Sequence, residues 1–433
     1  MWSKLTLLTL LTLPTLLTLN NMSRKHAVEQ YERLIQSAPR WYLDVNDFLD
    51  VYEYYEDEGR LADADVCLRY ALQLHPDDEL LLVKKAYALR SSGKVAEATA
   101  LIDRLNPELL EVRFFKAEEA LASFRVEEAN KIFRDMLVES GGGDSPVSPD
   151  MMDWGLHVDV AECYVAEGFW DEALYILRNI PDDAPDAKQV HLMRAECHYN
   201  QRDFDAAVAE VNAAIDVDSY AVEAWSMLAE LQYENQHFTE AQEACEYALA
   251  INADDEKSLR INYFAHACLN HRDEALAVAR HYVECWPNEY YLPMNAGELC
   301  LQMDNPDEAM SFLGRANVNC HPEHPDHDRI LTDVARVQAK QGHYEQSFQT
   351  VKRLYRRDHQ YEQVCLQMAA IAAENGNMDF ACQRLEEIAS KVVPGNNELI
   401  ANIFALLHEY PILYTKCPTL AVALQRLNTS TTL

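Results

Sequence analysis

Hydrophobic and polar residues of this chain alternate with a helical period that is interrupted by a short turn and then resumes. The stretch 222–255, VEAWSMLAELQYENQHFTEAQEACEYALAINADD, shows the pattern most clearly. Its apolar residues recur at spacings of three and four, which is typical of amphipathic helices. The polar tetrapeptide 234–237 separates two such runs. The pattern therefore predicts two helices joined by a tight turn.

The same pattern recurs with a period of 34 residues. When 222–255 is numbered from place 1 to place 34, large apolar residues stand at places 4 (Trp225) and 17 (Phe238), and alanines stand at places 8 and 20 (Ala229 and Ala241). Small residues at places 8 and 20 allow the two helices to approach closely, and large ones fill the gaps between neighbouring hairpins. The predicted repeats are 45–78, 79–112, 110–143, 154–187, 188–221, 222–255, 256–289, 290–323, 328–361 and 362–395.

This arrangement resembles the tetratricopeptide repeat, with about ten repeats over residues 45–395. Pro287 stands at place 32, where that family favours proline, whereas Pro293 at place 4 and Arg272 at place 17 depart from the family pattern. The resemblance implies an all-α fold, a right-handed α-solenoid superhelix of stacked helix-turn-helix hairpins. It also implies a protein that binds other proteins or peptides.

Segments outside the repeats complete the expected organisation. We expect a Leu/Thr-rich leader at 1–22, an N-terminal cap helix with three repeats at 23–140, and a Gly/Pro-rich segment at 141–150. Seven repeats follow at 151–395, and capping helices with a tail occupy 396–433. Caps cover the apolar ends of a solenoid and keep it soluble. The segment GGGDSPVSPD at 141–150 either breaks the stack or forms an exposed loop on a continuous one.

The leader repeats threonine every third residue between Thr6 and Thr18. A period of three matches neither a helix nor a strand, Pro14 interrupts the run, and no small-residue cleavage site follows it. Met22 is followed by Ser23, a suitable helix N-cap. Our hypothesis is that Met22 is the true start and that the preceding run is an artefact or a disordered leader. An unusual export signal is the alternative.

Composition narrows the range of partners and compartments. The chain has 71 acidic and 37 basic residues, a net charge of −34, which opposes binding to nucleic acid and docking on anionic lipid and favours basic protein segments. Its eleven cysteines are scattered, with no CxxC motif. That pattern favours free buried thiols in the reducing cytoplasm. Beyond the leader, no apolar run approaches the roughly 20 residues that span a bilayer.

Motifs for catalysis are missing from the sequence: it has no GxSxG, P-loop, GxGxxG or HExxH. Because each repeat contacts only its neighbours, the fold offers no closed pocket for chemistry. We therefore predict a protein that is not an enzyme and needs no cofactor. The one metal candidate is the insert 319–328, whose possible zinc ligands are Cys320, His321, His324 and His327. A solvated loop is the favoured interpretation of this insert, and a small metal site is the alternative.

The resemblance also implies which residues face a concave groove, namely places 2, 5, 9, 12 and 13. Place 9 is mostly glutamate, and if the repeats stack regularly these glutamates form a ladder of carboxylates. Aromatic side chains between them would contact apolar parts of a partner. The predicted partner-binding residues are Glu118, Glu162, Glu196, Tyr199, Glu230, Tyr233, Phe264, Glu298, Arg336 and Lys340. The alternative is a solvated helix face, for which glutamate is a common residue.

The last two residues of this set are basic. An acidic groove with a basic end would orient an extended peptide of opposite polarity, because complementary charges set register and on-rate. The sequence thus predicts a non-enzymatic scaffold that binds a basic or extended segment of another protein. Two alternatives remain: an accessory protein of the cell envelope that is exported by residues 1–21, and a regulatory subunit with a small metal site at 319–328.

Overall fold

The computed structural model describes residues 24, 26–33, 43–139, 153–184, 186–354, 361–392 and 397–430. The predictions for the leader 1–22 and for the segment 141–150 lie outside these residues. By its internal contacts the chain divides into two compact units, Met1–Gln201 (unit 1) and Arg202–Leu433 (unit 2). In the described part of both units all regular structure is helical.

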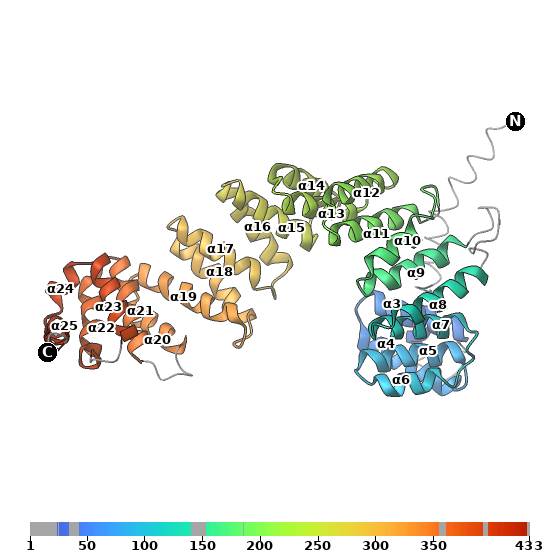
Figure 1. The fold of residues 1–433 in the computed structure, drawn as a ribbon, viewed down its shortest axis with the longest axis horizontal. Coiled ribbons are helices and arrows are strands. Elements are labelled where there is room, and N and C mark those ends of the chain that lie inside the picture. Colours follow the sequence, from blue (N-terminus) through green and yellow to red (C-terminus); the bar gives the residue numbers. More distant parts are fainter. Residues whose placement is uncertain are drawn as a thin grey trace. The chain divides into compact units, whose positions relative to one another are not determined.

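Helices follow one another as hairpin pairs (Figure 1). Unit 1 holds α3 (Val45–Asp57) with α4 (Leu61–Leu74), α5 (Glu79–Ser91) with α6 (Val95–Ile102), α7 (Leu110–Ala122) with α8 (Val126–Leu137), α9 (Trp154–Ala166) with α10 (Trp170–Leu177), and α11 (Ala187–Asn200). Unit 2 holds α12 (Phe204–Val217), then α13 (Val222–Glu234) with α14 (Phe238–Ile251), α15 (Glu256–Cys268) with α16 (Arg272–Cys285), α17 (Tyr291–Gln302) with α18 (Pro306–Asn319), α19 (Pro325–Lys340) with α20 (Tyr344–Leu354), and α21 (Tyr361–Glu374) with α22 (Met378–Ile388).

This order confirms the predicted fold class of stacked helical hairpins. In every predicted repeat the first helix begins within three residues of place 1, and the second begins at place 17. Place 20 is a buried alanine in all of them but one, where Ser347 takes its place with no exposed surface. A small side chain at this position lets the two helices of a hairpin pack closely, which is the role that the sequence predicted for it.

The turn inside each hairpin uses one left-handed residue, always at place 15. In half of the repeats it is a glycine (Gly59, Gly93, Gly168, Gly342 and Gly376), and in the other half it is Phe124, Arg202, Gln236, Asn270 or Asp304. In nine of these turns the amide of the next residue donates to the carbonyl five positions back, as Arg60 N donates to Tyr55 O at 2.8 Å. This is the hydrogen bond that closes a helix C-terminus when one residue is left-handed.

Residues outside the repeats pack against the first repeat of unit 1 and the last repeat of unit 2. Near the N-terminus Tyr31 is buried and meets the rings of Phe48 and Tyr55 edge-on, at centroid distances of 6.2 and 6.3 Å. At the other end lie α23 (Asn397–Glu409), α24 (Ile412–Lys416) and α25 (Pro418–Ser430). Leu413 and Leu420 from these helices join the core cluster that α21 and α22 form.

Cysteines sit within or beside the packed helices, and all eleven are free thiols. Burial raises the pKa of Cys197, Cys245 and Cys300 to about 12. These thiols stay protonated near neutral pH and are poor nucleophiles. In the part of the chain that the structure describes, no helix combines the length and the hydrophobicity needed to span a membrane.

Candidate interaction groove

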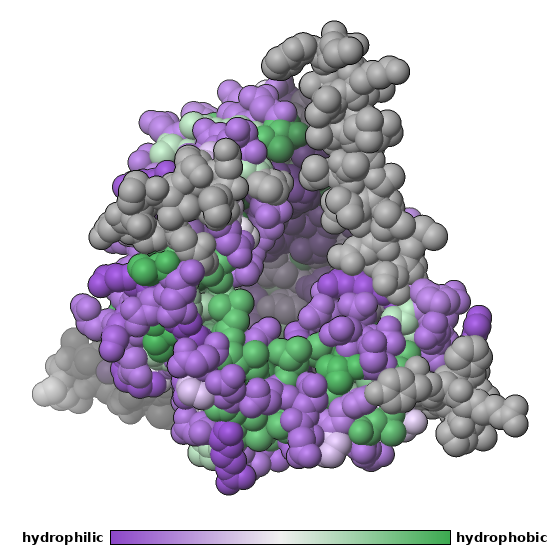
Figure 2. Space-filling model, turned by 90° about the vertical axis from the view of Figure 1, so that its right-hand side faces the viewer, coloured by the Kyte–Doolittle hydropathy of each residue, from purple (hydrophilic) through white to green (hydrophobic). Residues whose placement is uncertain are grey.

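A groove of about 650 Å³ lies on unit 1, where the first helices of four successive repeats line it. It is bounded by Leu49, Glu53, Leu80, Val83, Lys84, Tyr87, Arg90, Glu111, Phe114, Glu118, Asp159, Glu162, Cys163, Ala166 and Glu167. Place 9 contributes from every repeat in this series, as Glu53, Tyr87, Glu118 and Glu162. Figure 2 shows the side of the molecule that lies at the right of Figure 1, a mainly hydrophilic surface with groups of hydrophobic residues among the hydrophilic ones.

Apolar side chains form part of the groove wall at place 5. Leu49, Val83 and Phe114 occupy this place in α3, α5 and α7, and all three line the groove. Leu49 and Phe114 are half-buried, whereas Val83 is buried. Partly covered apolar surface between charged rims is the composition of sites that bind ligands or peptides.

Glu118 is the centre of a polar network across two repeats. Tyr87 Oη donates to Glu118 Oε1 at 3.0 Å, and Arg90 Nη2 donates to Glu118 Oε2 at 2.7 Å. The Arg90 guanidinium also lies over the Tyr87 ring, 4.7 Å from its centroid. Burial, reinforced by the neighbouring Glu118 charge, raises the pKa of Tyr87, so its hydroxyl remains a donor. These contacts hold the side chains of Tyr87, Arg90 and Glu118 in place in the middle of the groove.

Asp159 and Glu162 lie on α9, at the far end of the groove from α3. Burial raises the pKa of both carboxyl groups, and nearby carboxylates add to the effect: Asp153 and Asp186 for Asp159, and Asp159 for Glu162. Gln189 Nε2 donates to Glu162, but no ion pair with either carboxylate occurs among the described residues. Two partly desolvated, mutually repelling carboxylates without a cation form a favourable site for an incoming positive charge.

Two other predicted glutamates of place 9, Glu230 and Glu298, are bound by the next repeat. Lys257 Nζ lies 2.6 Å from Glu230 Oε2. Arg329 binds both carboxylate oxygens of Glu298, with Nε 2.6 Å from Oε1. Gln189, Lys257 and Arg329 all occupy place 2 of the repeat that follows. These carboxylates therefore join neighbouring hairpins, which the sequence analysis did not anticipate.

The other predicted binding residues lie on the first helices of their repeats. Glu196 and Tyr199 are half-buried on α11. Tyr233 places its hydroxyl 3.9 Å from Cys268 Sγ, and the Phe264 ring lies 6.0 Å from that of Tyr291.

The two basic residues of the predicted set are engaged in ion pairs. Arg336 pairs with Asp333 at 3.1 Å, and Lys340 pairs with Asp304 at 2.6 Å. Of the whole predicted set, the structure brings Glu118 and Glu162 together in the groove and places the rest along α11, α13, α15, α17 and α19.

Sequence reasoning missed several residues of the groove. Arg90 and Lys84 hold Glu118 and Glu53, while Asp159 and Cys163 come from α9. Arg90 stands at place 12, which the family resemblance assigns to the groove, so its position was a usable signal. Asp159 and Cys163 stand at places 6 and 10, which that assignment does not include.

The insert 319–328 does not gather its possible metal ligands. Cys320 is buried, with its sulfur 3.8 Å from the His321 carbonyl oxygen. His324 is the N-cap of α19, where its side chain accepts from Asp326 N at 3.3 Å, and His321 Nδ1 accepts from Glu323 N at 3.2 Å. These side chains serve the turn and the helix cap.

Comparisons with known proteins agree with the repeat pattern. The family model named tetratricopeptide repeat matches residues 161–218 and 192–256. No curated protein matches the chain significantly.

Solved structures similar to the chain include three repeat proteins of low identity. They are Pseudomonas aeruginosa pilF (14% identity, 51% of this chain and 96% of the other, TM-score 0.41), a tetratricopeptide repeat protein from Parabacteroides merdae (13%, 60% and 96%, TM-score 0.39), and YrrB, described as a TPR protein with an unusual peptide-binding site (18%, 44% and 93%, TM-score 0.36).

Proposed function

Since the chain is a tetratricopeptide repeat protein, we propose that it is a non-enzymatic scaffold whose unit 1 groove binds an extended, basic segment of a partner protein. The observation that carries this proposal is the combination of an apolar wall with two carboxylates of α9, Asp159 and Glu162, which pair with no cation among the residues that the structure describes. We propose that a basic side chain of the partner supplies the positive charge that these two carboxylates lack.

The charge balance of the groove supports a basic partner. Its lining includes six carboxylates (Glu53, Glu111, Glu118, Asp159, Glu162 and Glu167) and two cations (Lys84 and Arg90). Both cations are held by carboxylates of the groove itself, Lys84 by Glu53 at 3.2 Å and Arg90 by Glu118 at 2.7 Å. The remaining field is therefore negative and strongest toward α9. Such a field attracts basic segments and orients them as they approach.

The shape of the groove favours a partner segment in an extended conformation. The groove runs across four successive first helices, from α3 to α9, so an occupant contacts several repeats in turn. Leu49, Val83 and Phe114 recur at the same place of successive repeats, and the half-buried Leu49 and Phe114 offer apolar contacts to an occupant. We propose that apolar residues of the partner meet this wall while a lysine or arginine reaches Asp159 and Glu162.

The proposal is tested with the full chain and fluorescently labelled extended peptides of equal length. One peptide alternates apolar residues with lysine and arginine, and the other carries glutamate at the same positions. Fluorescence anisotropy is recorded at low and at physiological salt. The basic peptide should bind more tightly, and its affinity should fall as salt screens the groove. Equal binding of the acidic peptide would contradict the proposal.

Matched variants locate the binding site. Asp159→Asn with Glu162→Gln removes two charges from the groove, and Glu240→Gln with Glu243→Gln removes two exposed charges from α14 in unit 2. We expect the groove variant to weaken binding of the basic peptide about tenfold, which corresponds to about 1.4 kcal/mol. The α14 variant should change it less than twofold. Reversal of Glu230 is a poorer test, because it would also break the Lys257 ion pair between repeats.

The compartment is a separate part of the proposal. An odd number of scattered cysteines supports a reducing environment, and we place the protein in the cytoplasm. Mass spectrometry of the native N-terminus together with cell fractionation tests this placement. A mature chain that begins near residue 20 and is recovered from the envelope fraction would support the exported alternative instead.

A further inference from the structure

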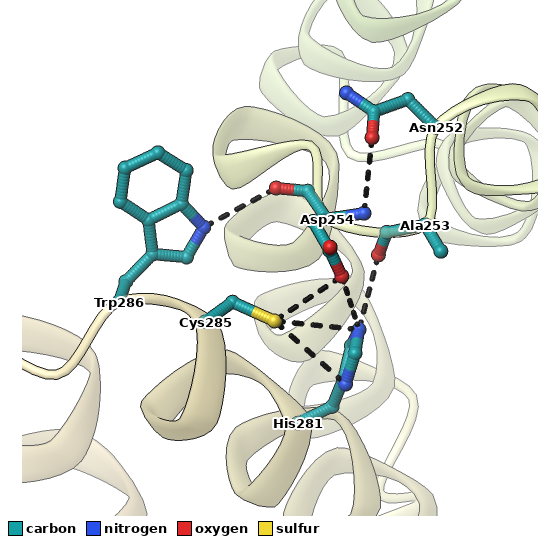
Figure 3. Close-up of polar contacts among 6 residues, drawn as sticks. All are labelled: Asn252, Ala253, Asp254, His281, Cys285 and Trp286. Carbon is teal, nitrogen blue, oxygen red and sulfur yellow. Dashed lines mark hydrogen bonds and ion pairs between the residues drawn. The ribbon is translucent and has the colours of Figure 1, made fainter.

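Three potential metal ligands of unit 2 converge on one point at the end of a hairpin (Figure 3). Asp254 belongs to the turn before α15, whereas His281 and Cys285 lie one helical turn apart at the end of α16. Cys285 Sγ is 3.2 Å from Asp254 Oδ1 and 3.7 Å from His281 Nε2, and His281 Nε2 is 3.2 Å from Asp254 Oδ1. We propose that these side chains form a zinc-binding site.

The separations match those between ligands of a tetrahedral zinc ion. With Zn–S near 2.3 Å and Zn–N and Zn–O near 2.0 Å, tetrahedral angles place the ligand atoms about 3.3 to 3.6 Å apart. The three observed distances, 3.2, 3.2 and 3.7 Å, lie close to this range. A cation can therefore take the centre of the triangle with small rotations of the side chains.

The arrangement differs from a relay that activates a thiol for catalysis. In such a relay the imidazole stands between the thiol and the carboxylate and uses a different ring nitrogen for each. Here Nε2 lies 3.2 Å from Asp254 Oδ1 and 3.7 Å from Cys285 Sγ, and Nδ1 lies 3.9 Å from the same sulfur. The carboxylate oxygen also contacts the sulfur directly. Asp254 is exposed and the other two are half-buried, so no enclosed pocket surrounds the thiol. A shared cation explains the triangle better than proton transfer does.

Neighbouring groups hold the Asp254 ligand in position. Asp254 N donates to Asn252 Oδ1 at 3.2 Å, and the indole Nε1 of Trp286 donates to the Asp254 carbonyl at 3.2 Å. The following residue, Asp255, caps α15 by accepting from Ser258 N at 2.9 Å. Hydrogen bonds of this kind orient metal ligands and raise affinity, and all but the last are visible in Figure 3.

Zinc is the metal that this ligand set favours. One thiolate, one imidazole and one carboxylate are all common zinc ligands, whereas magnesium and calcium prefer oxygen ligands alone. The three residues leave at least one coordination position open, which water can take. The bound ion would link the repeat 222–255 to the repeat 256–289, because Asp254 comes from the first and the other ligands from the second.

A second cluster, Cys382 with Glu386 and Cys417, also brings donor atoms together. In the first cluster one ligand atom has a backbone partner, because His281 Nε2 lies 3.1 Å from the Ala253 carbonyl oxygen, a contact that a bound ion would replace. In the second cluster two groups serve the backbone: Glu386 Oε1 accepts from Thr419 N at 2.9 Å, and Cys382 donates to Lys416 O at 2.9 Å. These bonds hold the start of α25 against α22. We therefore assign the zinc site to the first cluster and use the second as a control.

The full chain, purified without a histidine tag and stripped with a chelator, is titrated with Co²⁺ and then with Zn²⁺. Cobalt bound by a thiolate gives a sulfur-to-metal charge-transfer band, and displacement by zinc in the presence of a chromophoric chelator gives the zinc affinity. We expect one zinc per chain and a band that disappears in Cys285→Ala. His281→Ala should lower the zinc affinity at least tenfold.

Control variants separate this site from other thiols and imidazoles. Cys268→Ala removes an exposed cysteine of the same unit, Cys382→Ala alters the second cluster, and His324→Ala alters the insert. All three should keep the band and the zinc affinity of the parent chain. Circular dichroism checks that each variant is folded. The inference is overturned if Cys285→Ala retains the band, or if the parent chain binds zinc no more tightly than His281→Ala does.

Discussion

Gly297 offers a sharp test of how closely the helices of a hairpin pack. It lies on α17 at place 8 of the repeat 290–323, and a Cβ added there would lie 2.5 Å from Leu313 Cγ and 2.8 Å from Leu313 Cδ2 on α18. Leu313 has no exposed surface, so its side chain cannot swing into solvent. Overpacking of this kind costs about 1–3 kcal/mol. Alanine also gains about 1 kcal/mol over glycine within a helix, which opposes the clash.

A contact below 3.0 Å against a buried side chain places the clash at the upper end of that range, so we expect Gly297→Ala to lower the free energy of unfolding by about 1–2 kcal/mol. Gly314 is the matched control, because it lies within α18 and an added Cβ meets nothing within 4 Å. Gly314→Ala should therefore raise the free energy of unfolding by up to about 1 kcal/mol.

Urea unfolding followed by circular dichroism measures both changes. A double variant with Gly297→Ala and Leu313→Ala adds a coupling test, since the new methyl group then fills part of the space that Leu313 leaves. The two substitutions should together cost less than the sum of their separate costs. Stabilisation by Gly297→Ala, or equal effects of the two glycine substitutions, would refute the packing argument.

Other predictions concern the turns, a buried acid and a buried base. Phe124 is left-handed and exposed, so Phe124→Gly should raise the free energy of unfolding by up to about 1 kcal/mol, whereas Gly168→Ala should lower it by about 1 kcal/mol in the same urea assay. Burial raises the pKa of Asp333 to about 6. Between about pH 4 and 6 the folded chain therefore holds more protons than the unfolded chain, so the free energy of unfolding should fall as pH rises through this window. Asp333→Asn should reduce this fall in urea unfolding curves recorded across the same pH range. Arg194 donates to the carbonyls of Leu177 and Ile180, both at 2.8 Å. Arg194→Lys should lower the free energy of unfolding, measured by heat or urea, by about 2 kcal/mol, because one ammonium group cannot reproduce the guanidinium geometry.

The repeat register could be predicted from sequence because it depends on short-range patterns. Spacings of three and four define each helix, and the small residue at place 20 recurs at a fixed interval, so one well-formed stretch such as 222–255 fixes the frame of its neighbours. Even weak repeats follow this frame: α17 forms with Pro293 inside its first turn, where its missing amide has no helical partner. Local pattern and fold therefore agree throughout the described repeats.

Pairing between repeats could not be predicted in the same way. The periodicity located the glutamates of place 9, yet it did not show that Lys257 and Arg329 lie against Glu230 and Glu298. The ligands of the proposed zinc site were missed for a related reason. His281 and Cys285 are four residues apart, but Asp254 precedes them by 27 and 31 positions and meets them only through the stacking of two hairpins. Contacts of this kind depend on geometry that no single motif records.

The ion pairs between places 9 and 2 give the repeats a fixed order. A deletion of residues 256–289 would preserve the 34-residue frame and every turn, but it would set Glu230 against Tyr291 in place of Lys257. A deletion of 290–327 would instead bring Arg329 to Phe264. Although the repeats share one backbone plan, the repeats of Glu230 and Glu298 each carry a carboxylate that a cation of the natural successor pairs with. Repeats that arose as equivalent copies would thus have become specific for their neighbours. A chain whose repeats are shuffled should be less stable than the chain with the native order.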